Sequence, residues 1–472
     1  MKTNKLPNTT DPALQPFARP SGQFSGDTFP IFHNGVWHLF HMQMPAIGHH
    51  VSRDLVHWEA RPMAVARGAT GAPDCDNNAT GCIIEHAQRF YLFYTGNQNV
   101  CLAMSDDLDH WTKHPRNPLV QGDDKFYERA NFRDPFVFYH PPEKLWWMLV
   151  GTRTLDQPGQ RAGCVGLAKS RDLLHWQLGP PLWSPRTGPH MDCPQLLPAA
   201  GRWWLLHLQR NTRYRVCAKP TGPFHRSISR NLGTSLMAAG SRPGFDGKRW
   251  IAFPFVGRQK DASEAGDFEY GGPLAIPRQL RFSPRGVVTE RPADEVLAAL
   301  HALPNPGNPF VNSTPITGQW KTSSTGAMSQ SPAGGLLLLP TLPADFYLEF
   351  DLTLRQRDSD FHLLLRATPD LLHGYQLALH PRTRQVSLRP ISQWDLDRVL
   401  VSRSLAIPVG KPLKVRMFLA GSILEVFLGD RASLTARLYT RPEGLTGFEF
   451  RDGTGAVRNV QWRPLINQDS TE

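Results

Sequence analysis

Short runs of aromatic and aliphatic residues recur through the first 300 residues of the chain. Polar and glycine-rich stretches separate them, and none shows the spacing of an amphipathic helix. Their first residues lie 53, 56, 57 and 47 positions apart, in the order Trp37–Phe40, Phe90–Tyr94, Trp146–Leu149, Trp203–Leu206 and Trp250–Phe253. A period of roughly 50 residues, with several short strands per unit, is typical of propeller blades. The pattern therefore predicts an all-β fold that starts with a five-bladed β-propeller over residues 15–300.

A second repeated element follows the aromatic run in three of these units. It has the form Ser-x-Asp-Leu-x-His-Trp and occupies Ser52–Trp58, Ser105–Trp111 and Ser170–Trp176. Ser and Asp side chains accept hydrogen bonds from nearby backbone N–H groups and so favour turns. We interpret these segments as turns that pack the blades, and we do not count their Asp and His residues among the catalytic candidates.

The pattern changes after the propeller. Residues 294–303 predict a short helix, and the segment 301–319 is rich in Pro, Asn and Gly, which indicates a linker. Alternating strands then fill residues 320–466 and predict a β-sandwich. The expected strands are Phe346–Leu354, Phe361–Arg366, Tyr375–Leu379, Leu413–Leu419 and Ile423–Leu428. In such an arrangement we expect the sandwich to brace the propeller rather than to bind sugar.

Composition narrows the class of protein. The formal net charge is +11, but the basic residues are scattered, which favours a solubilising surface over a nucleic-acid site. The six Cys form no CxxC pair, so we expect no zinc or redox motif. No run reaches the roughly 20 apolar residues of a membrane helix. The N-terminus lacks a signal-peptide core, so we expect a cytoplasmic protein. We also expect a monomer or homodimer that needs no cofactor and no metal. The 13 Trp suit stacking on sugar rings.

Three acids lie at one phase of the repeat. Asp27, Asp134 and Asp192 precede the aromatic runs of their units by ten, twelve and eleven residues. At the same phase, unit two has Ala79-Thr80-Gly81 and unit five has Ala238-Ala239, without an acid. The first strand of each blade lines the central channel, so these carboxylates should meet near the axis. Burial and mutual repulsion should keep at least one of them protonated near neutrality. A protonated acid beside an ionised one is what cleavage of a glycosidic bond requires.

Several segments, taken in order, resemble those of a known family. They are Gly26–Phe40, Gly48-His49 with Ser52–Trp58, Ala79-Thr80-Gly81, Arg133-Asp134-Pro135, Asp192-Cys193-Pro194, Tyr270–Leu280 and Leu413–Tyr439. The series resembles glycoside hydrolase family 32, the β-fructofuranosidases, which include invertases, levanases and inulinases. The third segment stands at a Ser-Gly-Ser type motif, the fourth matches the Arg-Asp-Pro motif, and the fifth stands at the Glu-Cys-Pro motif.

The resemblance implies roles for the acids. Asp27 would be the nucleophile, Asp134 the stabiliser of the transition state and Asp192 the general acid/base of a retaining mechanism that needs no metal. Arg133 would also keep Asp134 ionised and bind a sugar hydroxyl. The expected substrate-binding residues are Arg133, Thr80, Gly81, His49, Phe29 and Cys193, with Phe24 and Phe132 as further aromatic walls.

Some positions depart from the family pattern. Asp192 replaces a Glu and is one methylene shorter, and a displacement near 1 Å costs about a hundredfold in rate; Glu128 and Glu269 are therefore alternative acids. Gly26 replaces an Asn, and Met42 replaces a Gln, in segments that normally contact the fructose ring. These changes favour an altered substrate preference over a loss of activity.

Other functions stay open on the sequence. A fructosyltransferase or an arabinofuranosidase-like enzyme would use the same acids on the same fold. A non-catalytic carbohydrate-binding propeller would explain the shorter acid at position 192. Product analysis distinguishes the first group from a hydrolase, and binding without turnover identifies the last.

Overall fold

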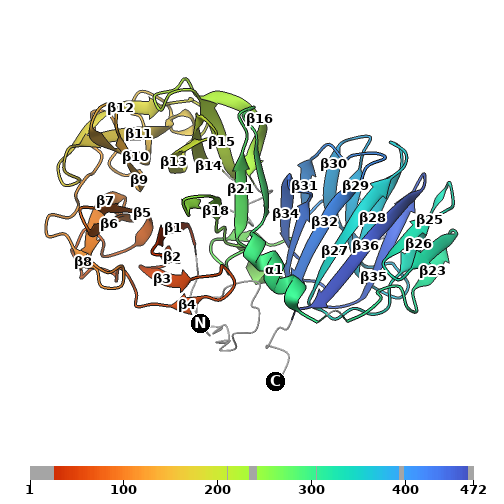
Figure 1. Cartoon of the computed structure of the whole chain (residues 1–472). Helices are drawn as coiled ribbons and strands as arrows, with labels where there is room; N and C mark the ends of the chain where they lie inside the picture. Colours follow the sequence, from red (N-terminus) through yellow and green to blue (C-terminus); the bar gives the residue numbers. More distant parts are fainter. Residues whose placement is uncertain (1–25, 210, 233–241, 305, 393–397, 466–472) are drawn as a thin grey trace.

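A computed structural model describes residues 26–209, 211–232, 242–304, 306–392 and 398–465 of the chain. Two β-rich parts lie side by side, a ring of five four-stranded sheets and a pair of seven-stranded sheets, with helix α1 (Asp294–Ala302) between them (Figure 1). The predicted all-β fold, with a five-bladed propeller followed by a sandwich, is confirmed. In the described part of the chain, no helix is long and apolar enough to span a membrane.

The propeller sheets follow one another in chain order, and each is antiparallel. Blade one contains β1 (Thr28–His33), β2 (Val36–Gln43), β3 (Ala46–Ser52) and β4 (Glu59–Ala60), and blade two contains β5 (Asn78–His86), β6 (Arg89–Gly96), β7 (Asn99–Ser105) and β8 (Thr112–Lys113). Blade three contains β9 (Phe132–His140), β10 (Leu145–Arg153), β11 (Gly163–Ser170) and β12 (Trp176–Trp183), and blade four contains β13 (Asp192–Ala199), β14 (Arg202–Gln209), β15 (Asn211–Cys217) and β16 (His225–Leu232). Blade five contains β17 (Gly244–Phe245), β18 (Trp250–Ala252), β21 (Arg278–Phe282) and β22 (Val288–Pro292).

Each repeated aromatic run forms the second strand of a blade. These strands are β2, β6, β10, β14 and β18, and each contains buried core residues. Large aromatic and aliphatic side chains fit the pleated surface of a strand whose two faces are both covered. The period in the sequence is therefore the spacing between blades, and the predicted repeat is confirmed.

The Ser-x-Asp-Leu-x-His-Trp segments are turns between the third and fourth strands of a blade. The Ser and Asp side chains accept backbone N–H groups of their own turn, and the Leu has a positive φ in all three copies. The Trp then packs edge-on against an aromatic ring of the preceding blade: Trp111 against Phe40, Trp176 against Phe93, and Trp58 of blade one against Phe253 of blade five. The predicted packing role of these turns is confirmed.

The sandwich strands form two sheets. One has the order β23 (Thr314–Thr317), β26 (Gly334–Leu338), β35 (Leu445–Arg451), β28 (Asp360–Ala367), β29 (Gly374–His380), β30 (Gln385–Ile391) and β31 (Val401–Ser404). The other has the order β24 (Trp320–Ser323), β25 (Gly326–Ser329), β36 (Gly455–Pro464), β27 (Phe346–Leu354), β32 (Leu413–Ala420), β33 (Ile423–Leu428) and β34 (Ala432–Arg437). Strand β23 lies within the segment 301–319 that the sequence suggested as a linker.

The sandwich and the propeller share a buried core. Tyr347, Phe418 and Phe427 of the sandwich belong to the same hydrophobic cluster as Trp37 and Phe253 of the propeller. A hairpin of blade five, β19 (Arg258–Gln259) and β20 (Phe268–Glu269), also reaches the sandwich, because Glu264 between the two strands accepts the N–H groups of Tyr439 and Thr440. The sandwich therefore supports the blade that closes the ring.

A buried ion pair crosses this interface. Arg278 of β21 is 2% exposed and donates to Glu425 of β33, whose other oxygen accepts the Ile276 N–H at 2.8 Å. The same guanidinium donates to Thr435 at 2.8 Å and contacts Glu290 at 3.3 Å. Removing one partner of such a pair leaves the other charge buried without compensation.

Replacing Arg278 with Met should lower the free energy of unfolding by about 3–5 kcal/mol, because the fully buried Glu425 loses its cationic partner. Denaturant unfolding of the purified chain measures this. Arg281→Met is the matched control, since Arg281 lies 3.6 Å from Asp430 in an exposed pair and its loss should cost less than about 1 kcal/mol. Equal losses in the two variants would contradict the prediction.

Candidate active site

Bulges in three inner strands turn residues toward the axis of the propeller. In β5 the register passes from Ala79↔Thr95 to Gly81↔Tyr94, so Thr80 is the extra residue. Strand β9 has the same irregularity at Asp134 and Pro135, and β13 has it at Cys193 and Pro194. A bulge re-aims a side chain that regular pleating would send into the sheet. Thr80, Asp134 and Cys193 can therefore meet across three blades.

The backbone is strained at two of these bulges. The φ angle is 59° at Asp134 and 49° at Cys193, and neither residue is a glycine. Such conformations cost free energy and persist where the surrounding structure holds them. Arg242, which precedes β17 and is 3% exposed, donates to the carbonyls of Asp134 at 2.7 Å and Pro135 at 2.6 Å. A buried guanidinium thus holds the bulge of β9 in place.

Asp27 lies directly before β1, and one of its oxygens is fixed while the other is not. The side chain is buried, and Oδ2 accepts hydrogen bonds from the Thr80 hydroxyl at 2.5 Å and the Cys193 thiol at 3.1 Å. The Asp27 N–H donates to the Tyr270 hydroxyl at 2.9 Å. Oδ1 is also buried and accepts no hydrogen bond of ordinary geometry from the described residues. Asp27 therefore presents one unshared oxygen on a restrained side chain.

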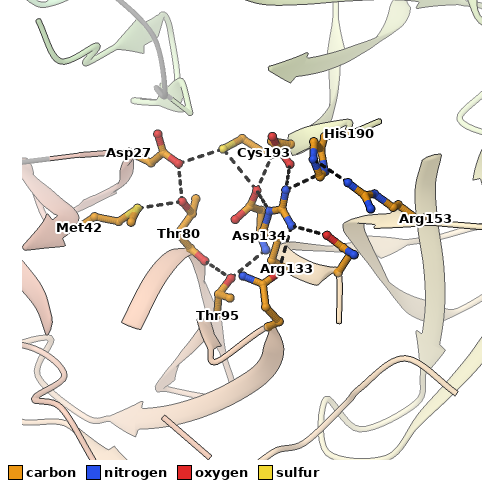
Figure 2. Close-up of polar contacts among 12 residues, drawn as sticks. Asp27, Met42, Thr80, Thr95, Arg133, Asp134, Arg153, His190 and Cys193 are labelled. Carbon is orange, nitrogen blue, oxygen red and sulfur yellow. Dashed lines mark hydrogen bonds and ion pairs between the residues drawn. The ribbon is translucent and has the colours of Figure 1, made fainter. Parts of the chain in front are cut away.

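Asp134 is connected to Asp27 through Cys193 (Figure 2). The Cys193 N–H donates to Oδ2 of Asp134 at 2.9 Å, and the thiol of the same residue reaches Asp27. The Asp134 N–H donates to the Thr95 hydroxyl at 2.8 Å, and Thr95 donates in turn to the carbonyl of Thr80 at 3.0 Å. Burial raises the pKa of the Cys193 thiol well above its usual range, so Cys193 keeps the proton that it donates.

Asp192 pairs with Arg133 at the more open side of the cluster. The side chain of Asp192 is 29% exposed, and its Oδ1 accepts a hydrogen bond from Nη2 of Arg133 at 2.8 Å. Arg133 also donates to Gln98 at 3.0 Å and contacts His190 at 3.0 Å. This side of the site therefore holds a group of polar side chains around Arg133.

The pKa values of two of the three acids are raised. Burial, and then the charge of Asp134, raises the pKa of Asp192 to about 7, although Arg133 opposes the change. Burial, and then the charge of Asp134, also raises the pKa of Asp27, against hydrogen bonds from Thr80 and Cys193. The cluster thus contains a carboxyl group that is half protonated near neutrality, as the phase of the three acids predicts.

Other residues that the sequence suggested for the site lie elsewhere. The ring of Phe29 packs on Phe40, and that of Phe132 packs on Tyr127. His49 stacks on Phe40 with centroids 4.1 Å apart and contacts His38. Phe24 lies outside the described residues, as do residues 238–239 of the repeat alignment.

The alternative acids and one glycine also have structural surroundings. Glu128 accepts the amide of Asn131 at 2.8 Å and lies 3.8 Å from Arg153, whereas Glu269 is exposed in strand β20. A Cβ at Gly81 would lie 2.3 Å from the carbonyl of Phe93, so Gly81 permits two strands to approach within blade two. Among the carboxyls compared, Asp192 is the one that meets the cluster.

Tyr270 is part of the site but was not predicted from the sequence. Tyr270 is 40% exposed, and its hydroxyl joins Asp27 and the sulfur of Met42. A Cβ on Gly26 would lie 2.5 Å from its ring, so the ring fills the space that a side chain at position 26 would need. The departure at Gly26 is the signal that could have revealed it. Thr95 and Arg242, which act through backbone groups, left no such signal.

Comparison with known proteins agrees with this geometry. Residues 27–232 match the sequence model of the glycosyl hydrolases family 32 N-terminal domain, and residues 314–464 match that of the family 32 C terminal. The chain belongs to glycoside hydrolase family 32. The N-terminal match starts at Asp27 and includes Asp134 and Asp192, and the C-terminal match covers the sandwich.

Curated relatives of this family 32 protein align with part of the chain. A sucrose-6-phosphate hydrolase of Zymomonas mobilis is 34% identical over 166 residues, which cover 31% of each chain. A fructan 6-exohydrolase of Beta vulgaris is 28% identical over 210 residues, 39% of this chain and 33% of the relative. The alignments thus span about a third of the curated relatives.

Solved structures match over nearly the whole chain. Fructan 1-exohydrolase IIa of Cichorium intybus superposes with a TM-score of 0.71 at 19% identity, covering 96% of this chain and 98% of that one. A β-fructofuranosidase of Bombyx mori gives a TM-score of 0.66 at 17% identity, covering 96% and 95%. At these identities the likeness shows the fold.

The raised pKa of Asp27 has a consequence for stability in this family 32 protein. Below the usual pKa of an aspartate, the carboxyl is protonated in both the folded and the unfolded state, and its burial costs little. As the pH rises from there to the raised folded pKa, the unfolded state releases the proton that the folded state retains, so the native state loses stability, and the full loss remains at higher pH. Asp27→Asn removes this cost and keeps an acceptor for Thr80. The variant should therefore have a higher Tm than the wild type at pH 8, with a smaller gain at pH 5.

Differential scanning calorimetry at the two pH values measures the gain. Asp358→Asn, which changes an aspartate whose side chain is 72% exposed, is the control and should leave Tm unchanged. A gain that is equal at both pH values, or a loss, would contradict the prediction.

Proposed function

We propose that this protein cleaves terminal β-fructofuranosidic bonds by a retaining, double-displacement mechanism. The observation that carries the proposal is the contrast between two carboxyls of one cluster. Asp192 has a pKa near 7 and is partly exposed, while Asp27 is held through Oδ2 with Oδ1 unshared. A proton donor and a restrained nucleophile are the two groups that retention requires.

The first step forms a covalent intermediate. Oδ1 of Asp27 attacks the anomeric carbon, the bond from that carbon to the leaving oxygen breaks, and the proton of Asp192 passes to the leaving oxygen. The Thr80 and Cys193 hydrogen bonds hold the other oxygen of Asp27, which orients the attack and keeps the carboxylate charge localised. Asp192 is then left as a carboxylate beside Arg133.

The second step releases the sugar. A water molecule attacks the anomeric carbon, its proton passes to Asp192, and the ester bond to Asp27 breaks. Positive charge builds up on the ring carbon in both steps. Asp134 is placed to stabilise this charge, because its Oδ2 is fixed by the Cys193 N–H and its backbone by Arg242. These roles agree with those that the family resemblance implies.

The named relatives support a substrate with a terminal fructosyl unit. They act, by their names, on sucrose 6-phosphate or on fructans. Sucrose, kestose-type oligosaccharides and longer fructans share that unit and differ in the leaving group. The polar group around Arg133, with Gln98 and His190, is placed to bind hydroxyls next to the scissile bond. Gly26 and Met42 replace the side chains usual in the family, and the Tyr270 ring lies against both, so we expect these three residues to influence the preference for the sugar ring.

Asp27→Asn should lower kcat/KM by more than about 10³-fold, because an amide cannot form the ester intermediate. Release of reducing sugar from sucrose, inulin, levan, short fructo-oligosaccharides and arabinofuranosides measures this for the wild type and the variant. Asp358→Asn is the control and should retain full activity.

The products separate the related functions. Free fructose as the main product supports hydrolysis, whereas longer oligosaccharides at high substrate concentration identify a transferase. Turnover of arabinofuranosides alone would replace the proposed substrate class. Binding of these sugars without turnover by the wild type would contradict catalysis altogether.

Activity should fall as the pH rises through about 7, because Asp192 must be protonated to act as the acid. Arg133 lowers the pKa of Asp192, so Arg133→Gln should move the alkaline limb of kcat/KM to higher pH while it raises KM. The pH profile of each protein checks this. Arg153→Gln is the control, since Arg153 contacts His190 but not Asp192. If kcat/KM of Arg133→Gln falls at the same alkaline pH as that of the wild type, the proton donor is an acid other than Asp192.

A further inference from the structure

A cluster of His and acidic side chains lies on the sandwich, away from the carboxylates of the propeller. Asp360 and His362 are two residues apart on β28, and His380 ends the neighbouring strand β29. Side chains two residues apart share a face of a strand. Phe361 between them points into the sandwich core, so the cluster lies on the outer face of this sheet.

The donor atoms of the three residues are close together. One ligand atom of each lies within 4.8 Å of those of the other two. Nδ1 of His380 is 2.6 Å from Oδ2 of Asp360, and the two imidazole centroids are 5.7 Å apart. Ligand atoms on a tetrahedral zinc ion are separated by about 3.3 Å, as bonds of about 2.0–2.1 Å require. Small rotations of side chains on a fixed sheet would close the difference.

His362 is the residue that points to a ligand. It is 3% exposed, and neither ring nitrogen makes a hydrogen bond of ordinary geometry to the described residues. Its Nδ1 lies 3.3 Å from Oε2 of Glu449 on β35, the strand on the other side of β28. Carboxylates beside metal-binding imidazoles commonly orient the ring in this way.

Glu449 lies close enough to orient Nδ1 of His362, but Nε2 makes no hydrogen bond to the described residues. Glu449 is already held by two hydrogen bonds from Arg451, at 2.8 and 2.9 Å. The Asp–His pairs of the blade turns differ from this cluster. There the Asp also accepts backbone N–H groups, and among the described residues no third His, Cys, Asp or Glu lies close enough to complete a metal site. The turn pairs stabilise their own loops. In the sandwich cluster, Nε2 of His362 makes no hydrogen bond to the described residues and is therefore available to a ligand.

We propose that Asp360, His362 and His380 bind a divalent transition-metal ion, with Zn²⁺ as the best match. Two imidazoles and one carboxylate suit zinc, while calcium and magnesium prefer oxygen ligands only. Water would complete the coordination. The ion cross-links β28 and β29 and thereby stabilises the sandwich that braces blade five. It has no part in the proposed glycosidase reaction, so the two proposals stand independently.

Zinc binding by the full chain tests the proposal. The protein is treated with a chelator, dialysed and titrated with Zn²⁺, and bound metal is measured by mass spectrometry together with Tm. The wild type should bind one equivalent and gain Tm. His380→Gln, which can still donate to Asp360, and Asp360→Asn should each bind at least about tenfold more weakly and gain no Tm, since each loses one ligand. His110→Gln, from a turn pair, should behave as the wild type.

Cobalt distinguishes this site from cysteine sulfur. Co²⁺ bound by nitrogen and oxygen gives visible bands without the ultraviolet charge-transfer band of a thiolate. The proposal is overturned if the wild type binds no metal, if His380→Gln and Asp360→Asn bind as well as the wild type, or if the thiolate band appears. Near-ultraviolet circular dichroism of each variant shows that it is folded, so that a loss of binding reports the ligand.

Discussion

Asp27, Asp134 and Asp192 meet among the inner strands of the propeller, and the repulsion between their carboxylates is the constraint that the rest of the site meets. Burial and like charge both favour the protonated form. Each acid is stabilised by different hydrogen-bond donors. Thr80 and Cys193 donate to Asp27, the backbone N–H of Cys193 donates to Asp134, and Arg133 donates to Asp192. The different environments give the acids different pKa values, which is what the proposed mechanism requires of a proton donor and a nucleophile.

The partners come from different blades, so the site depends on how the blades are held together. Cys193 of blade four contacts acids of blades one and three, and Arg242 of blade five holds the bulge of blade three. The Trp of each repeated turn fixes one blade against the preceding one, and the sandwich supports the last. A relative shift of any blade would change the separation of the acids, which is why a rigid ring suits this chemistry.

Much of the fold could be predicted from the sequence because blade packing repeats its residues. The aromatic runs, the Trp turns and the phase of Asp27, Asp134 and Asp192 follow from the period alone. The bulges at Thr80, Asp134 and Cys193 could not be predicted, since they depend on the register between strands. Phe29 and His49 looked like pocket residues because they stand near motif residues, yet strand alternation turns them into the blade.

Tyr270 shows a different limit of sequence reasoning. It lies in blade five, more than 240 residues after Asp27, and its hydroxyl receives the N–H of that residue. Gly26 leaves space for the Tyr270 ring, and this dependence between the two residues is not visible in the sequence because they lie far apart along the chain. A substitution at one of the two sites is therefore interpretable only with the other in view.

The contact between Trp58 and Phe253 has a consequence for biosynthesis. The first blade receives this ring from a partner almost 200 residues further along the chain. While the protein leaves the ribosome, blades two and three can dock on their predecessors as they appear, but blade one keeps an uncovered tryptophan face until blade five has been made. Contacts of such long range close slowly. The nascent chain thus exposes an apolar edge from the completion of blade one until blade five has been made, and blade five then completes the packing of blade one.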